Sequence, residues 1–251
     1  MSSPALAIRD LHKSFGALPV AQSIDLSLEP GARHALIGPN GAGKTSLVNL
    51  ITGALTPDKG TVSLAGRDIT ALDQAGRCRL GLVRTFQISQ LFHGLTVLEN
   101  VCLSIAERRG VAGAMFRPFG RQREVIDEAM ELLKSFELQQ DAPRPVGELA
   151  YGRQRLVEIA IAMGQRPKVL LLDEPAAGVP LAESRIILDI IEELSDSICV
   201  LIIEHDMELV FRFARRITVM VSGKIFTEGT PEEIASDDRV RSVYLGESFT
   251  V

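Results

Sequence analysis

The sequence contains no tryptophan and has few other aromatic or sulfur-containing residues, with two tyrosines and three cysteines among 251 residues. The cysteines are far apart and form no CxxC pair, which argues against a zinc site or a disulfide framework and favours a reducing compartment. Long apolar runs are also missing. Segments 169–172 and 198–203 are strand-sized, well below the roughly 20 residues of a membrane span. The N-terminus lacks a basic start followed by an apolar core, so we expect no signal peptide.

An excess of basic residues is absent as well. There are 27 Lys and Arg against 32 Asp and Glu, a net charge of −5 with histidine neutral. This balance argues against a general nucleic-acid-binding protein, which would carry more Lys and Arg. The apolar share of 46% and the charged share of 24% are typical of a globular protein that buries a core without crosslinks. At this length one large domain or two small ones are expected.

The hydrophobic pattern changes twice along the chain. Residues 5–28 alternate, with Ile24, Leu26 and Leu28 on one face, which predicts half-buried antiparallel strand. Residues from about 95 to 163 follow a helical period. The remaining segments alternate between strand and helix, and they predict a mainly parallel sheet covered on both faces. The predicted strands are 34–37, 61–66, 169–172, 198–203 and 217–221, and the predicted helices are 44–54, 182–194 and 206–215.

The segment GPNGAGKT at 38–45 fits the phosphate-loop pattern GxxxxGK[ST], between a predicted strand and a predicted helix. Its glycines let backbone N–H groups approach phosphate oxygens, and the helix N-terminus adds partial positive charge. Lys44 can reach the β- and γ-phosphates, and the Thr45 hydroxyl can hold Mg²⁺. The alternative is a glycine-rich turn that binds nothing. The residues expected to contact ATP here are Gly38, Pro39, Asn40, Gly41, Ala42, Gly43, Lys44, Thr45 and Ser46.

Two carboxylates follow the buried strand 169–172. In open α/β sheets, ligands lie beyond such strand ends. Asp173 can hold Mg²⁺, and Glu174 can orient or deprotonate an attacking water. The alternative is a strand leading into a turn started by Pro175. His205 follows a second buried strand and is expected at the same edge, within reach of a γ-phosphate oxygen. The other three histidines lack this setting, and we predict them to be structural or surface residues: His12, His34 and His93.

The order of these motifs resembles the ATP-binding subunit of an ABC transporter over essentially the whole chain. The sequence reads RTFQ at 84–87, LAYGRQR at 149–155, LLLDEP at 170–175 and IIEHD at 202–206. The resemblance implies that Gln87 touches the metal and the γ-phosphate, with a role in catalysis. It implies that Phe15 stacks on adenine. It also implies a signature segment that caps the ATP of the opposite subunit, comprising Ala150, Tyr151, Gly152 and Arg153.

The same resemblance implies the fold and its parts. We expect an α/β P-loop NTPase of the ABC ATPase type, with a RecA-like mainly parallel sheet core, an antiparallel β subdomain and an inserted α-helical subdomain. The single ABC ATPase domain 1–251 would comprise 1–87 (β part and first half of the core), 88–163 (helical subdomain with the signature) and 164–251 (second half of the core).

The detailed sequence of the motifs resembles one branch of the family most, the importers of branched-chain and other hydrophobic amino acids. The segments that carry this are VRTFQISQLFHGLTVLENV, LAYGRQR, DEPAAG and GTPEEI…VYLGE. This resemblance implies two integral membrane permease subunits and a second, non-identical ATP-binding subunit. It further implies a periplasmic or extracellular solute-binding protein as an indirect partner, no nucleic acid, and a peripheral place on the cytoplasmic face of the cell membrane.

Two residues depart from the family pattern. The signature serine, whose hydroxyl contacts the γ-phosphate, is replaced by Ala150, a loss worth roughly 1.5–3 kcal/mol in the closed state. The family's aspartate after the second motif is replaced by Pro180. We therefore expect a competent site from this chain's own loop and carboxylates against a partner's intact signature, and a weaker second site.

Several alternatives remain open at this point. A soluble ABC ATPase of an assembly pathway, such as iron–sulfur cluster assembly, shares the same motifs. A lipid or lipopolysaccharide exporter ATPase and, more remotely, a P-loop kinase are further readings. The Arg-rich segment 108–123 is expected to be a solvated loop, or else a contact with anionic lipid or an acidic partner.

Overall fold

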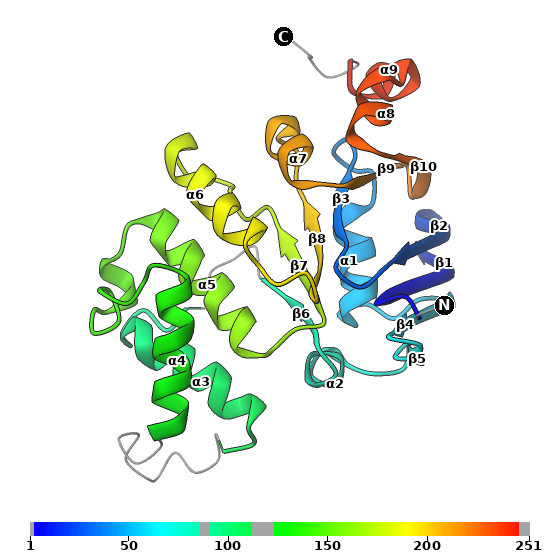
Figure 1. Ribbon diagram of the computed structural model, residues 1–251. Coiled ribbons are helices and arrows are strands. Elements are labelled where there is room, and N and C mark those ends of the chain that lie inside the picture. Colours follow the sequence, from blue (N-terminus) through cyan, green and yellow to red (C-terminus); the bar gives the residue numbers. More distant parts are fainter. Residues whose placement is uncertain (1–2, 86–90, 112–122, 246–251) are drawn as a thin grey trace. The chain divides into compact units, whose positions relative to one another are not determined.

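The computed structural model describes residues 3–85, 91–111 and 123–245, which group into two compact units (Figure 1). The sheet unit comprises Met1–Leu82, Lys168–Glu174 and Ser195–Val251. The helical unit comprises Val83–Pro167 and Pro175–Leu194.

An antiparallel sheet forms the first part of the sheet unit. Its strand order is β2-β1-β4-β5. In the pairing of β1 with β2, Leu6 lies opposite Leu28 and Ile8 opposite Leu26. These side chains are buried, whereas Asp25 is exposed, so the alternation predicted for residues 5–28 is confirmed. The bounds are β1 Leu6–Phe15, β2 Leu18–Leu28, β4 Lys59–Leu64 and β5 Arg67–Asp68.

The second sheet has the order β10-β9-β3-β8-β7-β6. The central pairs β3–β8, β3–β9 and β7–β8 are parallel, and β9–β10 is antiparallel. Every residue of β3, β7 and β8 is buried, as expected for parallel strands covered on both faces. The bounds are β3 Arg33–Ile37, β6 Leu82–Arg84, β7 Val169–Asp173, β8 Cys199–Ile203, β9 Arg216–Val221 and β10 Lys224–Gly229.

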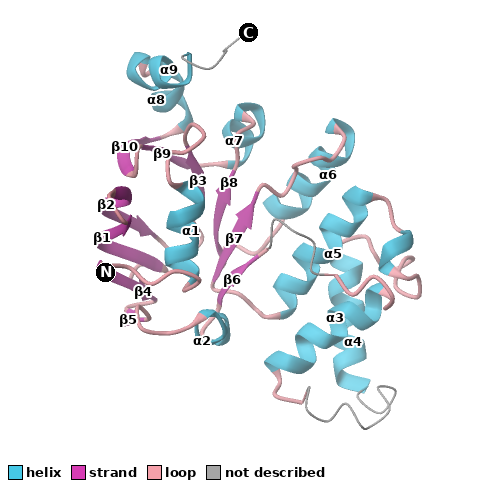
Figure 2. Cartoon of the chain, turned by 180° about the vertical axis from the view of Figure 1, so that it is seen from behind, coloured by secondary structure: helices cyan, strands magenta, loops and turns pink. Residues whose placement is uncertain are grey.

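Helix α1 (Lys44–Thr52) packs between the two sheets of this unit (Figures 1 and 2). Its apolar side chains Leu47, Leu50 and Ile51 are fully buried in one cluster with residues of both sheets, among them Ile24 and Leu201. Burial of this apolar surface on both sides fixes the helix that follows the 38–45 loop. The other helices of the sheet unit are α2 Gln74–Arg79, α7 Met207–Phe213, α8 Pro231–Ser236 and α9 Asp238–Leu245.

In the described residues of the helical unit there are the helices α3, α4, α5 and α6 and one 3₁₀ turn, and α3, α4 and α5 pack against one another (Figure 2). The predicted helical period is confirmed in α4, where Val125, Ala129 and Leu133 are buried on one face. A capping box between Thr96 and Glu99 starts α3. The bounds are α3 Val97–Arg108, α4 Arg123–Ser135, the 3₁₀ turn Val146–Glu148, α5 Tyr151–Gly164 and α6 Leu181–Glu192.

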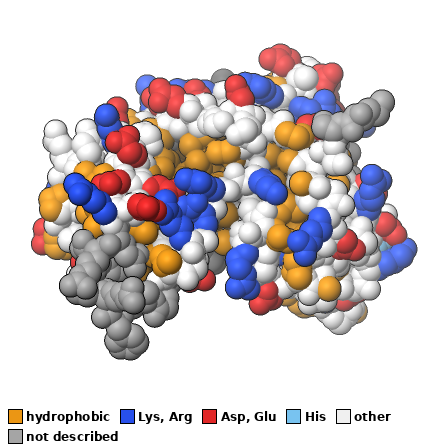
Figure 3. Space-filling view, turned by 60° about the horizontal axis from the view of Figure 1, so that its bottom comes forward, with side chains coloured by type: hydrophobic (Ala, Val, Ile, Leu, Met, Phe, Trp, Pro, Cys, Tyr) orange, Lys and Arg blue, Asp and Glu red, His pale blue; other side chains and the backbone are white. Residues whose placement is uncertain are grey.

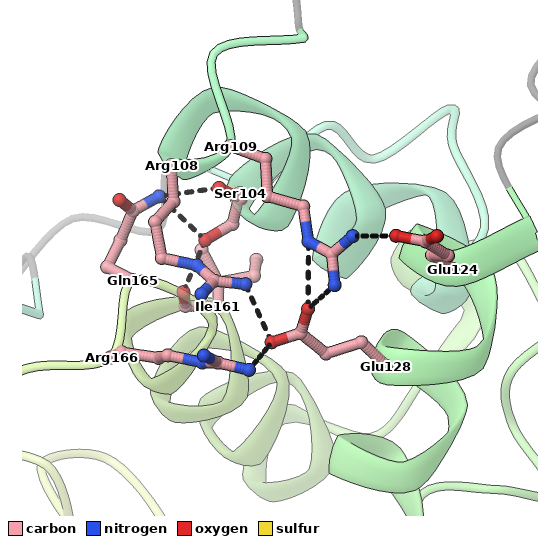
Figure 4. Close-up of polar contacts among 8 residues, drawn as sticks. All are labelled: Ser104, Arg108, Arg109, Glu124, Glu128, Ile161, Gln165 and Arg166. Atoms are coloured by element: carbon pink, nitrogen blue, oxygen red, sulfur yellow. Dashed lines mark hydrogen bonds and ion pairs between the residues drawn. The ribbon is translucent and has the colours of Figure 1, made fainter.

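A network of ion pairs joins α3, α4 and the end of α5 (Figure 4). The carboxylate of Glu128 accepts hydrogen bonds from Arg108 at 2.6 Å, from Arg109 at 2.7 Å and from Arg166 at 2.8 Å. Arg109 also binds Glu124 at 2.8 Å. Two arginines of the basic segment 108–123 therefore bind carboxylates within this unit. Arg123 begins α4, and Arg117 and Arg121 lie outside the described residues.

Within the described part of the chain, no helix has both the length and the apolar character needed to cross a membrane. The cysteines, whose separation argued against a disulfide framework, are all free thiols. Figure 3 shows one face of the molecule, where Lys and Arg side chains lie beside Asp and Glu side chains, in keeping with a net charge of only −5.

Candidate active site

The loop between β3 and α1 packs closely against neighbouring backbone of the sheet unit. A Cβ atom at Gly38 would collide with the carbonyl oxygen of Met220. Gly43 has φ of 100° and ends the loop as the N-cap of α1, with no side-chain hydrogen bond to the helix. A Cβ there would lie 2.5 Å from the Val20 carbonyl oxygen. Only glycine fits these positions, and the N–H groups at the start of α1 are left for a ligand.

The Lys44 side chain folds back over this loop. Its Nζ donates to the carbonyl oxygens of Gly38 at 2.6 Å and Pro39 at 3.1 Å. Burial lowers the pKa of Lys44, and the charges of Glu174 and Asp173 partly oppose that shift. The ammonium thus lies on the loop that precedes α1, where phosphate oxygens would meet the helix N-terminus. Thr45, in the first turn of α1, is exposed.

The predicted carboxylates lie at the carboxyl end of β7. Asp173 is its last residue and is buried. Glu174 adopts φ of 47°, an uncommon conformation for a residue with a side chain, and its N–H donates to the Ile203 carbonyl at the end of β8. The carboxylate of Asp173 and the hydroxyl of Thr45 are hard oxygen donors of the kind Mg²⁺ prefers, so this pair fits a magnesium site.

The imidazole of His205 lies beside the second carboxylate. Its Nδ1 is 3.6 Å from Glu174 Oε1 and 3.8 Å from Glu204 Oε2. The His205 side chain is 68% exposed, whereas that of Glu204 is 2% exposed. Sequence reasoning missed Glu204. Its signal is an acidic residue directly after the fully buried strand β8.

Phe15, expected to stack on adenine, ends β1 with half of its surface exposed. The Nζ atom of Lys13 lies 6.0 Å from its ring centroid. The ring is therefore available to a flat ligand in the same unit as the 38–45 loop. Gln87 lies outside the described residues.

The segment Ala150–Arg153 belongs to the helical unit, where it starts α5. Ala150 is the N-cap and makes no side-chain hydrogen bond. Tyr151 is exposed, and its hydroxyl accepts a hydrogen bond from Arg155 at 2.5 Å. Gly152 is buried against Glu183 of α6, where a Cβ would collide with the carboxylate. The guanidinium of Arg153 is bound within the unit.

Family models and known proteins match this chain along most of its length. Residues 21–177 match the ABC transporter family, and residues 224–250 match the branched-chain amino acid ATP-binding cassette transporter family. The chain is 40% identical to the high-affinity branched-chain amino acid transport ATP-binding protein LivG of Salmonella typhimurium, over 99% of this chain and 100% of the relative. It is 39% identical to BraF of Pseudomonas aeruginosa, a protein of the same description, with the same coverage.

Solved structures match along the same length. The ADP conformation of MJ1267, an ATP-binding cassette of an ABC transporter, matches with a TM-score of 0.87 and 33% identity over 98% of this chain and 100% of that one. The dimeric cassette MJ0796 matches in fold, with a TM-score of 0.76 at 24% identity over 90% of this chain and 98% of that one. The predicted ABC ATPase fold is confirmed. The chain belongs to the ABC transporter ATP-binding proteins, in the branch that contains the LivG and BraF proteins.

Proposed function

We propose that this chain binds and hydrolyses ATP to drive an importer of branched-chain or other hydrophobic amino acids. One observation carries the proposal. Lys44 begins α1 after the loop that follows β3, and Asp173, Glu174 and His205 lie at the carboxyl ends of β7 and β8, in a chain related to the LivG protein over 99% of its length. Transport of branched-chain amino acids is the function in the names of these relatives.

Each described residue has a role that its position supports, whereas the role of Gln87, which lies outside the described residues, is proposed from the family resemblance alone. The N–H groups at the start of α1 and the Lys44 ammonium neutralise phosphate charge. Thr45 and Asp173 would hold Mg²⁺, which would supply further neutralisation of the phosphate charge. Glu174 accepts a proton from the attacking water, and the exposed His205 donates to a γ-phosphate oxygen. Gln87 contacts the metal and senses the membrane partner, and Phe15 stacks on the base.

Hydrolysis in this scheme needs a second ATP-binding subunit. The nucleotide on one subunit is capped by the signature of the other, and closure excludes bulk water from the reaction. Ala150 offers no hydroxyl to a partner's nucleotide, and Pro180 offers no carboxylate. We propose a non-identical partner with an intact signature, so that the site built on this chain's Lys44 and Glu174 is the stronger of two.

The remaining partners follow from the same proposal. Two integral membrane permease subunits form the pathway, and a periplasmic or extracellular solute-binding protein delivers the amino acid. This chain binds the permeases from the cytoplasmic face of the membrane.

The first test is gel filtration of the isolated Glu174→Gln chain with Mg-ATP and with Mg-ADP, together with an ATPase assay of the transport complex that contains it, using Glu29→Gln at an exposed position as the control. We expect normal ATP binding and hydrolysis slower by roughly 10²- to 10⁴-fold. Unchanged turnover would reject the general-base role. An ATP-dependent homodimer would reject the need for a different partner. Copurification of membrane proteins with tagged chain separates an importer from a soluble assembly ATPase, and solute uptake separates it from an exporter.

A further inference from the structure

Asp141 carries a buried carboxylate in the loop between α4 and α5. Its side chain is 9% exposed and binds two guanidinium groups of the same unit. Oδ1 accepts from Arg144 Nη1 at 2.9 Å, and Oδ2 accepts from Arg153 Nε at 2.5 Å. Two cations on one buried acceptor form charge-assisted hydrogen bonds, the strongest class in proteins. Asp141 is thus the centre of a clamp, defined as Arg144, Asp141 and Arg153.

The clamp also makes hydrogen bonds to the backbone of the loop that precedes α5. Arg153 Nη2 donates to the Glu137 carbonyl at 2.7 Å, and Arg144 Nη2 donates to the Glu148 carbonyl at 3.3 Å. The loop before α5 is thereby attached to the third residue of that helix. The backbone adds a further attachment, because the N–H of Val97 in α3 donates to the Arg144 carbonyl.

The start of α5 needs this support for two reasons. Its N-cap, Ala150, contributes no side-chain hydrogen bond. An arginine in the first turn also places positive charge at the positive end of the helix dipole. The carboxylate of Asp141 neutralises that charge and holds the Arg153 side chain aside, so the first-turn N–H groups keep their geometry for an anion.

We propose that Asp141 is a positioning residue for the signature segment. It holds Arg153, and through Arg153 the first turn of α5, in the conformation that caps the nucleotide bound to the partner ATPase subunit. The inference rests on the proposed function, since it takes the partner's ATP as the ligand of this segment. Asp141 itself does not touch the nucleotide.

A shallow polar cleft opens at the clamp, with a volume of about 570 Å³. Its lining residues are Glu137, Gln139, Gln140, Asp141, Arg144 and Arg153. Water in this cleft screens the outer guanidinium atoms, because the Arg153 side chain is 38% exposed. Loss of the Asp141 charge is therefore expected to loosen the first turn of α5 without unfolding the unit.

The test uses the transport complex purified from its native membrane through a tag on this chain. The complex carries Glu174→Gln in this chain, so that the remaining turnover comes from the site that this chain's signature caps. In that background we expect Asp141→Asn to raise the KM for ATP roughly tenfold with kcat within about twofold of the parent complex, since a contact equal in ground and transition states is weakened. ATP affinity of the isolated chain, measured with a fluorescent ATP analogue, should not change. Asp127→Asn, an exposed aspartate of α4, is the matched control.

A double-mutant cycle with Arg153→Gln separates positioning from general destabilisation. If Asp141 acts through Arg153, Asp141→Asn adds nothing to the KM of the Arg153→Gln complex. A normal KM in Asp141→Asn, or effects that multiply in the double variant, would overturn the proposal. If Asp141→Asn does not fold, Arg153→Gln alone must raise the KM, and an unchanged KM overturns the proposal equally. A wild-type complex without ATPase activity would instead refute the proposed function.

Discussion

Replacement of Arg77 by methionine should destabilise the helix that carries the phosphate loop. Arg77 is 1% exposed and lies in α2, and its guanidinium donates to four carbonyl oxygens of the described residues. The two in the last turn of α1 are Leu50 at 2.7 Å and Ile51 at 2.6 Å. The others belong to Thr70 at 2.8 Å and Leu72 at 3.0 Å.

The magnitude follows from those four acceptors. Each carbonyl left without its donor in a buried setting costs about 1–3 kcal/mol. Methionine removes the buried charge and refills part of the volume, which offsets some of the loss. We therefore expect Arg77→Met to lower the free energy of unfolding by about 3–5 kcal/mol. The free energy of unfolding of Arg77→Lys should lie between those of wild type and Arg77→Met, because an ammonium keeps the charge but cannot reach all four acceptors.

The assay is urea unfolding followed by circular dichroism, with hydrogen exchange of residues 44–52 as a local probe of α1. Arg79→Met is the matched control, since Arg79 lies in the same helix and is exposed. We expect Arg79→Met to stay within about 0.5 kcal/mol of wild type. A loss below about 1 kcal/mol in Arg77→Met would show that solvent replaces the guanidinium at these carbonyls and would refute the reasoning.

Two further predictions concern the sheet unit. His34 is buried and its Nε2 lies 2.7 Å from the hydroxyl of Thr218, and burial lowers its pKa from 6.5 to about 4. As the pH falls, His34 therefore binds its proton in the unfolded chain before it does so in the folded protein, and stability present above pH 6.5 is lost. Between pH 7 and pH 5, the free energy of unfolding of wild type should fall by about 2 kcal/mol more than that of His34→Asn in denaturant titrations. Equal falls in the two proteins would contradict the pKa shift. Gly43→Ala should reduce ATP affinity at least roughly tenfold in fluorescence titrations, because its Cβ would meet the Val20 carbonyl. Gly41→Ala should keep more of the affinity, because nothing lies within 4 Å of the added Cβ. A greater loss of affinity in Gly41→Ala than in Gly43→Ala would contradict this prediction.

The predicted secondary structure is accurate where the hydrophobic period is strong and weaker at short elements. The strand predicted at 198–203 is β8, and the helix predicted at 44–54 is α1, which ends at Thr52 before Gly53 in the left-handed conformation. The strand predicted at 61–66 ends at Leu64, because Ala65 and Gly66 adopt positive φ in a turn. The strand β10, at 224–229, was not predicted. It alternates half-buried and exposed residues, and its pairing with β9 depends on a non-local partner.

The places of the proposed site residues in the fold could be predicted from the sequence because their motifs are local. Residues 38–45 stand between a strand and a helix, and Asp173 and His205 stand at strand ends, so a parallel sheet brings them to one edge. Glu204 was missed because its near-complete burial beside His205 depends on packing that a single sequence does not display.

Sequence alone indicated the family through the resemblance of its motifs. It also predicted the 38–45 loop and the type of the main elements, because these depend on short-range periodicity and on glycine and lysine at fixed spacing. Tertiary structure decided which polar groups meet. Arg77 donates hydrogen bonds to carbonyl groups of α1, and Asp141 accepts one from Arg153. Both contacts depend on the course of the intervening loops, which no local sequence pattern predicts. The physical reason is that a buried charge takes whichever acceptor the packed chain brings within about 3 Å, and that choice is made by the whole fold.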